Sequence, residues 1–380
     1  ARRRFALGRL GEELAAGLRE RPADIGWVNL HYHTCYSYNP NGWTPAQIAW
    51  FALQRGLHAA GIVDFDVLDG VDEMLAAGAA LDLRTTAGLE CRVYVPELAA
   101  HEINSPGEPG IAYHMGIGFA ASEVPEALRP FLRRLREISE RRNRDLVRRV
   151  NTYLAPVELD YDQDVLPLTP AGNATERHIC LAYARKARHL FGGEASLIAF
   201  WSEKLRCDAA ELDPPEGVAL QNRIRAITMK AGGVGYVKPD SGSFPPIAET
   251  NRFFLEAGAI PLVTWLDGTS SGERSADELL ELHLAGGAEG VNIIPDRNYR
   301  AGVKDEKLQN LQRIVEAAVA REMFLVCGTE MNSPGNKFVD DFQTEELRPL
   351  LPHFVRGAHI VYGHTVLAQY AGLGYVSDWS

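Results

Sequence analysis

The sequence predicts an α/β protein with a parallel sheet flanked by helices, either barrel-like or doubly wound. Two observations predict this class. Short apolar segments of the kind that form buried strands alternate with helical segments, and this alternation occurs in two series, one toward each end of the chain. In such sheets the reactive side chains gather where the strands end, so polar residues at those positions are the candidates for chemistry.

The first strand is predicted at 28–33, where apolar residues alternate with Asn29, His31 and His33. Because side chains repeat every two residues along a strand, His31 and His33 point to the same face. The two imidazoles could be core histidines with their own hydrogen-bond partners, or a chelating pair for a metal ion. The spacing favours the metal ion.

The helix predicted at 44–56 has well-marked ends. Thr44 can cap it, Pro45 suits the first helical position, Gln47 completes a capping box and Gly56 ends it. The rest of the first series is a strand at 58–66, a helix at 70–80 and a β-rich segment at 84–95 that carries Glu90.

The second series repeats helix and strand three times near the end of the chain. The predicted helices are 245–258, 275–287 and 306–322, and the predicted strands are 259–267, 290–295 and 323–331. The segment between the two series has long helical patterns and few β-rich runs, which predicts a helical insertion. Nine arginines lie between Arg129 and Arg149. They are interpreted as a solvated helix face paired with acidic residues, the alternative being an electropositive wall or a nucleic-acid patch.

Composition limits the class of partner. The chain has 39 Lys and Arg against 50 Asp and Glu, a net charge of −11, which argues against nucleic acid or an anionic membrane as the main partner. Five scattered cysteines form neither a disulfide framework nor a zinc knuckle and fit a reducing cytoplasm. Residues 1–24 predict an amphipathic helical extension and not a signal peptide.

Residues with metal-ligand chemistry collect near the predicted strand ends. Each could be a turn residue or a hydrogen-bonded core residue, but their spread over separate strands of one sheet favours a common site. Histidine nitrogen together with carboxylate oxygen suits zinc, iron or manganese. The residues are His31, His33, Asp64, Asp66, Glu90, His114 and Glu330.

Several segments also match known motifs in the correct order. NLHYHTCYS is similar to H-x-H-[ST]-x-x-S, GLHAAGIVDFDVLDG to G-L-x-x-x-x-I-T-D-H-D-x-x-x-G, AGLECRV to a G-x-E segment, and YHMGIGF to H-[IL]-L-G-x-G-F. GNATERHICLAYARK is similar to an R-x-H helix, and EMFLVCGTEMNSPGNKF to G-S-D-x-H-G. With these motifs the chain resembles the PHP (polymerase and histidinol phosphatase) superfamily of metal-dependent phosphoesterases.

The resemblance implies a distorted TIM-like β/α barrel of the PHP type with a helical insertion. The implied domains are an N-terminal helical extension at 1–24, the barrel at 25–120 and 236–345, the insertion at 121–235 and a C-terminal extension at 346–380.

The resemblance also implies a reduced metal site. Family members commonly hold three metals. The ligands of the first site correspond to His31, His33, Glu90 and Glu330. The second site would use His114, but Trp265 most closely matches its other histidine, and Phe65 and Asn332 replace the histidines of the third. One divalent metal, zinc, manganese or iron, is therefore expected, with a second less favoured.

The expected activity is hydrolysis of a small, phosphorylated molecule by a metal-activated water, with Asp64, Asp66 or His114 as general base. Two alternatives stay open: a non-catalytic protein that binds a ligand or metal, and a metal enzyme for a non-phosphorylated substrate presented to the loops of Asn104 and Asn332. GTSSG around Ser270 resembles a serine-hydrolase motif, but it predicts a loose loop rather than a nucleophile elbow. The candidate substrate-binding residues are Arg177, His178, Lys238, Arg297, Asn332 and Lys337.

Overall fold

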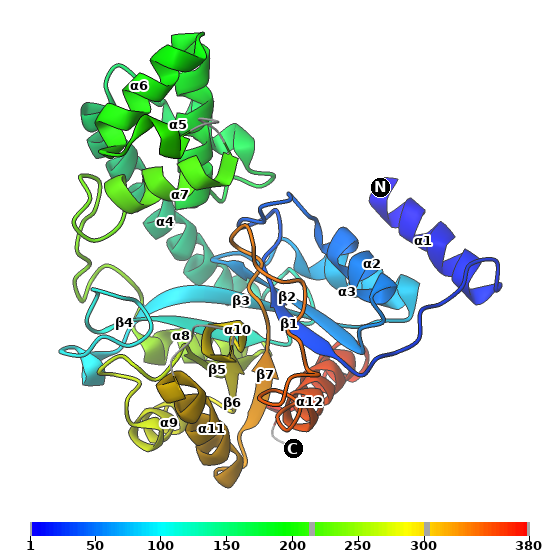
Figure 1. The fold of residues 1–380 in the computed structure, drawn as a ribbon. Coiled ribbons are helices and arrows are strands. Elements are labelled where there is room, and N and C mark those ends of the chain that lie inside the picture. The colour runs from blue at the N-terminus through cyan, green and yellow to red at the C-terminus, as the bar shows by residue number, and fades with distance from the viewer. Residues whose placement is uncertain (1, 213–216, 300–304, 378–380) are drawn as a thin grey trace. The chain divides into compact units, whose positions relative to one another are not determined.

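A computed structural model describes residues 2–212, 217–299 and 305–377. The strands in these ranges form one seven-stranded sheet in the order β1 to β7 (Figure 1). Their bounds are β1 Val28–Tyr32, β2 Ala59–Phe65, β3 Arg84–Tyr94, β4 Ile111–Ile117, β5 Ile260–Trp265, β6 Gly290–Ile293 and β7 Phe324–Cys327.

The sheet is nearly closed into a barrel. The first and last strands meet at an isolated parallel bridge between Tyr32 and Glu330, where the backbone N–H of His33 donates to the carbonyl of Glu330 at 2.7 Å. Nδ2 of Asn29 donates to Oγ1 of Thr329 at 2.8 Å along the same seam. The predicted barrel-like α/β architecture is confirmed.

One strand departs from the predicted parallel sheet. β4 runs antiparallel to both β3 and β5, whereas the other neighbouring pairs are parallel. The connection between β3 and β4 contains only the short helix η1 Pro96–Leu98. A parallel return usually uses a helix as its crossover, and this connection has no helix long enough to cross back over the sheet.

Helices cover the sheet as the two series predict. In α2, Thr44 and Gln47 form the expected capping box, and Pro45 begins the helix. The helices that belong with the sheet are α1 Arg2–Ala15, α2 Pro45–Gln54, α3 Val71–Leu81, α8 Ile247–Glu256, α9 Ala276–Ala285, α10 Asp296–Tyr299, α11 Asp305–Ala320 and α12 Leu351–Ala371. None of the helices in the described ranges is long and apolar enough to cross a membrane.

The described chain divides into two compact units. The first contains residues 1–35, 39–132 and 241–380, and the second contains residues 36–38 and 133–240. Four α-helices of the described chain belong to residues 133–240 of the second unit. They are α4 Arg129–Leu154, whose first residues are in the first unit, α5 Glu176–Phe191, α6 Glu194–Leu205 and α7 Gly217–Thr228. Short helical turns are η2 Glu126–Leu128, η3 Tyr161–Val165, η4 Leu166–Leu168 and η5 Ala209–Leu212.

The second unit has its own apolar core, which includes Val150, Ile179, Tyr183 and Trp201. On α4, Arg144 forms ion pairs with Glu140 and Asp162 at 2.7 and 2.6 Å, in agreement with a solvated face of paired charges.

Candidate metal centre

The end of β1 brings two imidazoles together. Nε2 of His31 and Nε2 of His33 are 3.3 Å apart, and both side chains are fully buried. Asn29 and Tyr32 pair with Ala60 and Ile62, so β1 contains one more residue than β2 across this interval. Such a bulge bends the strand and re-aims its side chains. Oδ1 of Asn29 accepts the backbone N–H of His31 at 3.0 Å inside the bulge.

Glu90 completes the cluster from β3. Its Oε2 is 3.3 Å from Nε2 of His33 and 3.6 Å from Nε2 of His31. The side chain is buried, and among the described residues Oε2 has no hydrogen-bond partner. Two imidazole nitrogens and a carboxylate oxygen therefore surround one point, with all three ligand atoms within 4.8 Å of one another.

The spacing of these atoms fits a metal ion. With zinc–nitrogen bonds of about 2 Å, two ligands of a tetrahedral site are about 3.3 Å apart. The three separations in the cluster are 3.3, 3.3 and 3.6 Å. Two histidines and one carboxylate also form a donor set that zinc, iron and manganese accept. The residues present thus fit one divalent transition metal.

Asn292 of β6 orients His31. Its Oδ1 is 3.3 Å from Nδ1 of His31, and the amide is fully buried. A carbonyl oxygen only accepts, so the proton of the imidazole lies on Nδ1 and the lone pair of Nε2 faces His33 and Glu90. On the other ring, Phe65 stacks against His33 with ring centroids 4.3 Å apart. Asn292 is not among the candidate site residues that the sequence predicts.

The charges in the cluster depend on one another. Burial alone would raise the pKa of Glu90, but the close imidazoles of His31 and His33 lower it to about 2. Burial would lower the pKa of His31, but the interactions with Glu90, Glu330 and Asn292 together raise it. Glu90 is therefore a carboxylate, the form in which a glutamate binds a cation.

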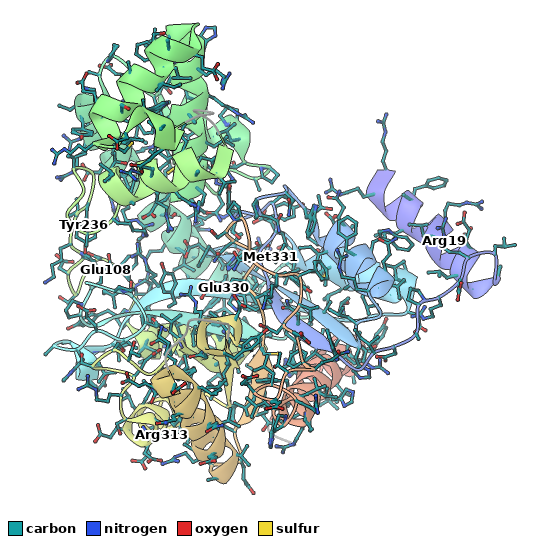
Figure 2. The ribbon with its side chains drawn as sticks, viewed as in Figure 1. Arg19, Glu108, Tyr236, Arg313, Glu330 and Met331 are labelled. Atoms are coloured by element: carbon teal, nitrogen blue, oxygen red, sulfur yellow. The ribbon has the colours of Figure 1, made fainter. Side chains whose placement is uncertain are left out.

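Glu330 lies beyond β7 beside this cluster, but its carboxylate has another partner. Nη2 of Arg297 is 3.2 Å from Oε2 of Glu330. Glu330 and Met331 both have positive φ, 63° and 51°, a backbone region that L residues seldom adopt (Figure 2). The structure brings His31, His33 and Glu90 together and pairs Glu330 with Arg297.

His114 is not part of the cluster, contrary to the prediction. In the antiparallel register Glu90 is opposite Met115, and Cys91 is opposite His114. Directly opposed residues share a face, so His114 lies on the face opposite to Glu90. There its Nε2 bonds to Oδ1 of Asn251, and burial lowers its pKa to about 4. Tyr113 takes the inward position and lies 5.9 Å from Phe65, centroid to centroid.

Of the predicted general bases, Asp64 has a structural role. Its two carboxylate oxygens accept the backbone N–H and the hydroxyl of Thr34 at 2.8 and 2.7 Å. Its register partner on β3 is Leu89, so it also faces away from Glu90. Asp66 follows with positive φ, and its N–H donates to the carbonyl of Glu90 at 2.8 Å.

The register of β5 also corrects the expectation that Trp265 stands at a ligand position. Thr264 is in register with Asn292, and Trp265 with Ile293. Because Asn292 faces His31, Thr264 holds the inward position and Trp265 the outward one. Trp265 is 1% exposed and belongs to the apolar core.

The other predicted substrate residues belong to both units. Nζ of Lys337 is 2.9 Å from Asp296, while Asn332 is half-buried in the loop after β7. Arg177, His178 and Lys238 belong to the second unit. In α5, Nδ1 of His178 accepts the N–H of Thr175 at 3.1 Å as part of a capping box, and Arg177 bonds to Asn222. Lys238 is exposed.

Asn104, Ser270 and His364 each form hydrogen bonds that stabilise the fold. The amide of Asn104 bonds to the carbonyls of Tyr113 and Thr264 at 3.0 and 2.7 Å, so it joins β4 to β5 and does not offer its amide to a ligand. Oγ of Ser270 accepts the N–H of Glu273 in a turn, as expected for a loop. Nε2 of His364 donates to the carbonyl of Gly258 at 2.8 Å, and the ring is a buried structural histidine.

Comparison with known proteins supports the fold. No protein-family model and no curated protein sequence matches the chain. Among solved structures, a proposed metal-dependent phosphoesterase from Bifidobacterium adolescentis has a TM-score of 0.56 at 18% identity, covering 88% of this chain and 98% of its own. An amidohydrolase from Chromobacterium violaceum, solved with sulfate and no metal, has a TM-score of 0.56 at 16% identity. The match covers 85% of this chain and 96% of the amidohydrolase. At these identities the likeness establishes the fold.

Proposed function

We propose that the chain is a metal-dependent hydrolase of the PHP type that cleaves a phosphoester in a small molecule. The single observation that carries the proposal is the buried cluster of His31, His33 and Glu90, whose three ligand atoms have the separations of a tetrahedral metal site. A divalent metal at such a site supplies Lewis-acid polarisation and makes water nucleophilic near neutral pH.

The residues of the chain have separate roles in this proposal. Asn292 holds the proton of His31 on Nδ1, and the carboxylate of Glu90 would balance part of the positive charge of the metal ion. Arg297, whose side chain is 45% exposed, binds the anionic group of the substrate in exchange for Glu330. Asp66, whose positive φ takes it out of the alternation of β2, accepts a proton as general base in this proposal, since Asp64 and His114 face away from Glu90.

A non-phosphorylated substrate is the second candidate, and one observation favours it. Phe65 stacks on His33 at a position where the resemblance predicts a further metal ligand, and the ring of Tyr113 lies next to Phe65. Such a site has less positive charge to offer a phosphate. The amidohydrolase from Chromobacterium violaceum has the same fold.

The test combines metal content with activity. The wild-type chain, His31→Ala and Glu90→Ala are purified without chelators, measured for metal per chain and screened against phosphoesters and amides with added zinc or manganese. We expect about one equivalent of metal and hydrolysis in the wild type, and loss of both in the variants. Hydrolysis that survives both substitutions contradicts the mechanism, and bound metal without hydrolysis of either class favours a non-catalytic protein.

A further inference from the structure

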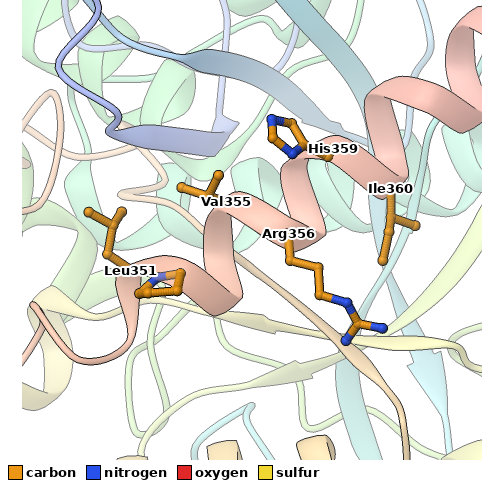
Figure 3. Close-up of a pocket in the computed structure, with 6 residues that line it drawn as sticks. Leu351, Val355, Arg356, His359 and Ile360 are labelled. Atoms are coloured by element: carbon orange, nitrogen blue, oxygen red, sulfur yellow. The ribbon is translucent and has the colours of Figure 1, made fainter.

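Two histidines outside the cluster also face each other. His58 directly precedes β2, and His359 lies on α12, at the end of the sheet opposite to the strand ends that carry Arg297 and Glu330. Their Nε2 atoms are 2.7 Å apart, a hydrogen-bond distance, so the exposed ring of His359 has to move by about 0.6 Å to reach the separation of about 3.3 Å between two ligands of a tetrahedral ion. His359 is one of six residues of α12, shown in Figure 3, that line an open pocket of 680 Å³: Leu351, Pro352, Val355, Arg356, His359 and Ile360.

Asp24 fixes the orientation of His58. Its Oδ2 is 2.7 Å from Nδ1 of His58, and its Oδ1 accepts the backbone N–H of Gly26 at 2.8 Å. The carboxylate is therefore held in place and keeps a proton on Nδ1. The lone pair of Nε2 then faces His359, as in the carboxylate–histidine pairs behind many metal ligands.

The charges around the pair leave His359 neutral. Burial lowers its pKa, and the nearby His58 and Arg84 lower it further. Arg84 opposes a cation here, but its Nη1 is directed to the backbone carbonyl of His58 at 3.4 Å, and Asp24 supplies a compensating negative charge. Neutral imidazole is the form that binds metal, and the exposed position of His359 leaves room for water as further ligands.

We propose that His58 and His359 form a second divalent transition-metal site, in which Asp24 positions His58. Zinc, copper and nickel are the ions that suit two imidazoles. The two ligands come from separate elements, so the ion ties α12 to the start of β2. A metal that binds only the folded chain also stabilises it.

The direct test is the number of zinc equivalents bound by the full chain at saturation. We expect His359→Gln to bind one equivalent less than the wild type. The control is His353→Gln, which removes a half-buried histidine from the same helix and should bind as many equivalents as the wild type. Asp24→Asn should weaken this site about 10–100-fold. Equal stoichiometry in His359→Gln and the wild type overturns the proposal.

A thermal measurement separates this site from the first one. Saturating Ni²⁺ should raise the Tm of His31→Ala, which retains both His58 and His359, and should raise it less in the double variant His31→Ala/His359→Gln. An equal rise in the two proteins contradicts the second site, whatever the outcome for hydrolysis. Failure of the first site appears instead as a wild type whose bound metal is unaffected by His31→Ala.

Discussion

Oδ1 of Asn292 lies 3.3 Å from Nδ1 of His31, although 261 residues separate them in the sequence. The contact joins β6 to β1 across the inside of the barrel. It selects the tautomer of His31 in which Nε2 is free to bind a metal.

We therefore expect Asn292→Ala to weaken metal binding about 10–100-fold, because the imidazole loses the acceptor that orients it. Asn292→Asp keeps an oxygen acceptor and should retain most of the affinity. Metal affinity measured by competition with a chromophoric chelator checks both variants. An alanine variant with wild-type affinity would show that the contact does not position His31.

Asp64 tests the difference between a structural and a catalytic carboxylate. It is 2% exposed and accepts two hydrogen bonds from Thr34. Asp64→Ala leaves these donors without their partner, so we expect the free energy of unfolding to fall by about 1–3 kcal/mol. Urea denaturation measures the change. A large loss of kcat with unchanged stability would instead make Asp64 the general base.

The two neighbouring residues of β5 test which side chain occupies the inward position beside Asn292. Trp265→Ala removes a ring from the apolar core and should cost about 3–5 kcal/mol of unfolding free energy. Thr264→His places an imidazole on the inward face, in register with Asn292, and should strengthen metal binding. If Trp265→His strengthens binding and Thr264→His does not, the inward residue is Trp265.

The sequence predicted the fold and the centre of the site for identifiable reasons. The capping box of Thr44 with Gln47 and the shared face of His31 and His33 depend only on residues close together in the sequence, so a local pattern predicts them. The face of His114 depends on the direction and register of β4, and no local pattern contains this information. The partner of Glu330 is Arg297, which lies 33 residues away, so its choice is also set by tertiary structure.

Buried histidines make stability depend on pH. Burial lowers the pKa of His114 to about 4 and that of His178 to about 4, whereas an unfolded histidine titrates near 6.5. Between these values the unfolded chain binds protons that the folded chain does not. The stabilisation is therefore complete above about pH 6.5 and is lost as the pH falls toward about 4.

We expect the free energy of unfolding to fall over this interval, with up to about 3 kcal/mol from each group. Urea unfolding measured at several pH values gives the slope. His114→Gln, compared with the wild type, should have a shallower slope because one of the protons is no longer taken up. An unchanged slope would mean that His114 is protonated in the folded state.

Gly328 determines how closely β7 approaches the metal ligands. A Cβ atom at this position would lie 2.4 Å from Cβ of His31 and 2.6 Å from its backbone nitrogen, and neither can move without moving β1. We expect Gly328→Ala to lower both the Tm and the metal affinity, since the displaced His31 no longer faces Glu90. Gly363→Ala is the matched control, because a Cβ there meets nothing within 4 Å and alanine favours the helix. Calorimetry and metal titration of the two variants check this, and a Gly328→Ala chain with wild-type metal affinity would show that the position of His31 tolerates a shift of β1.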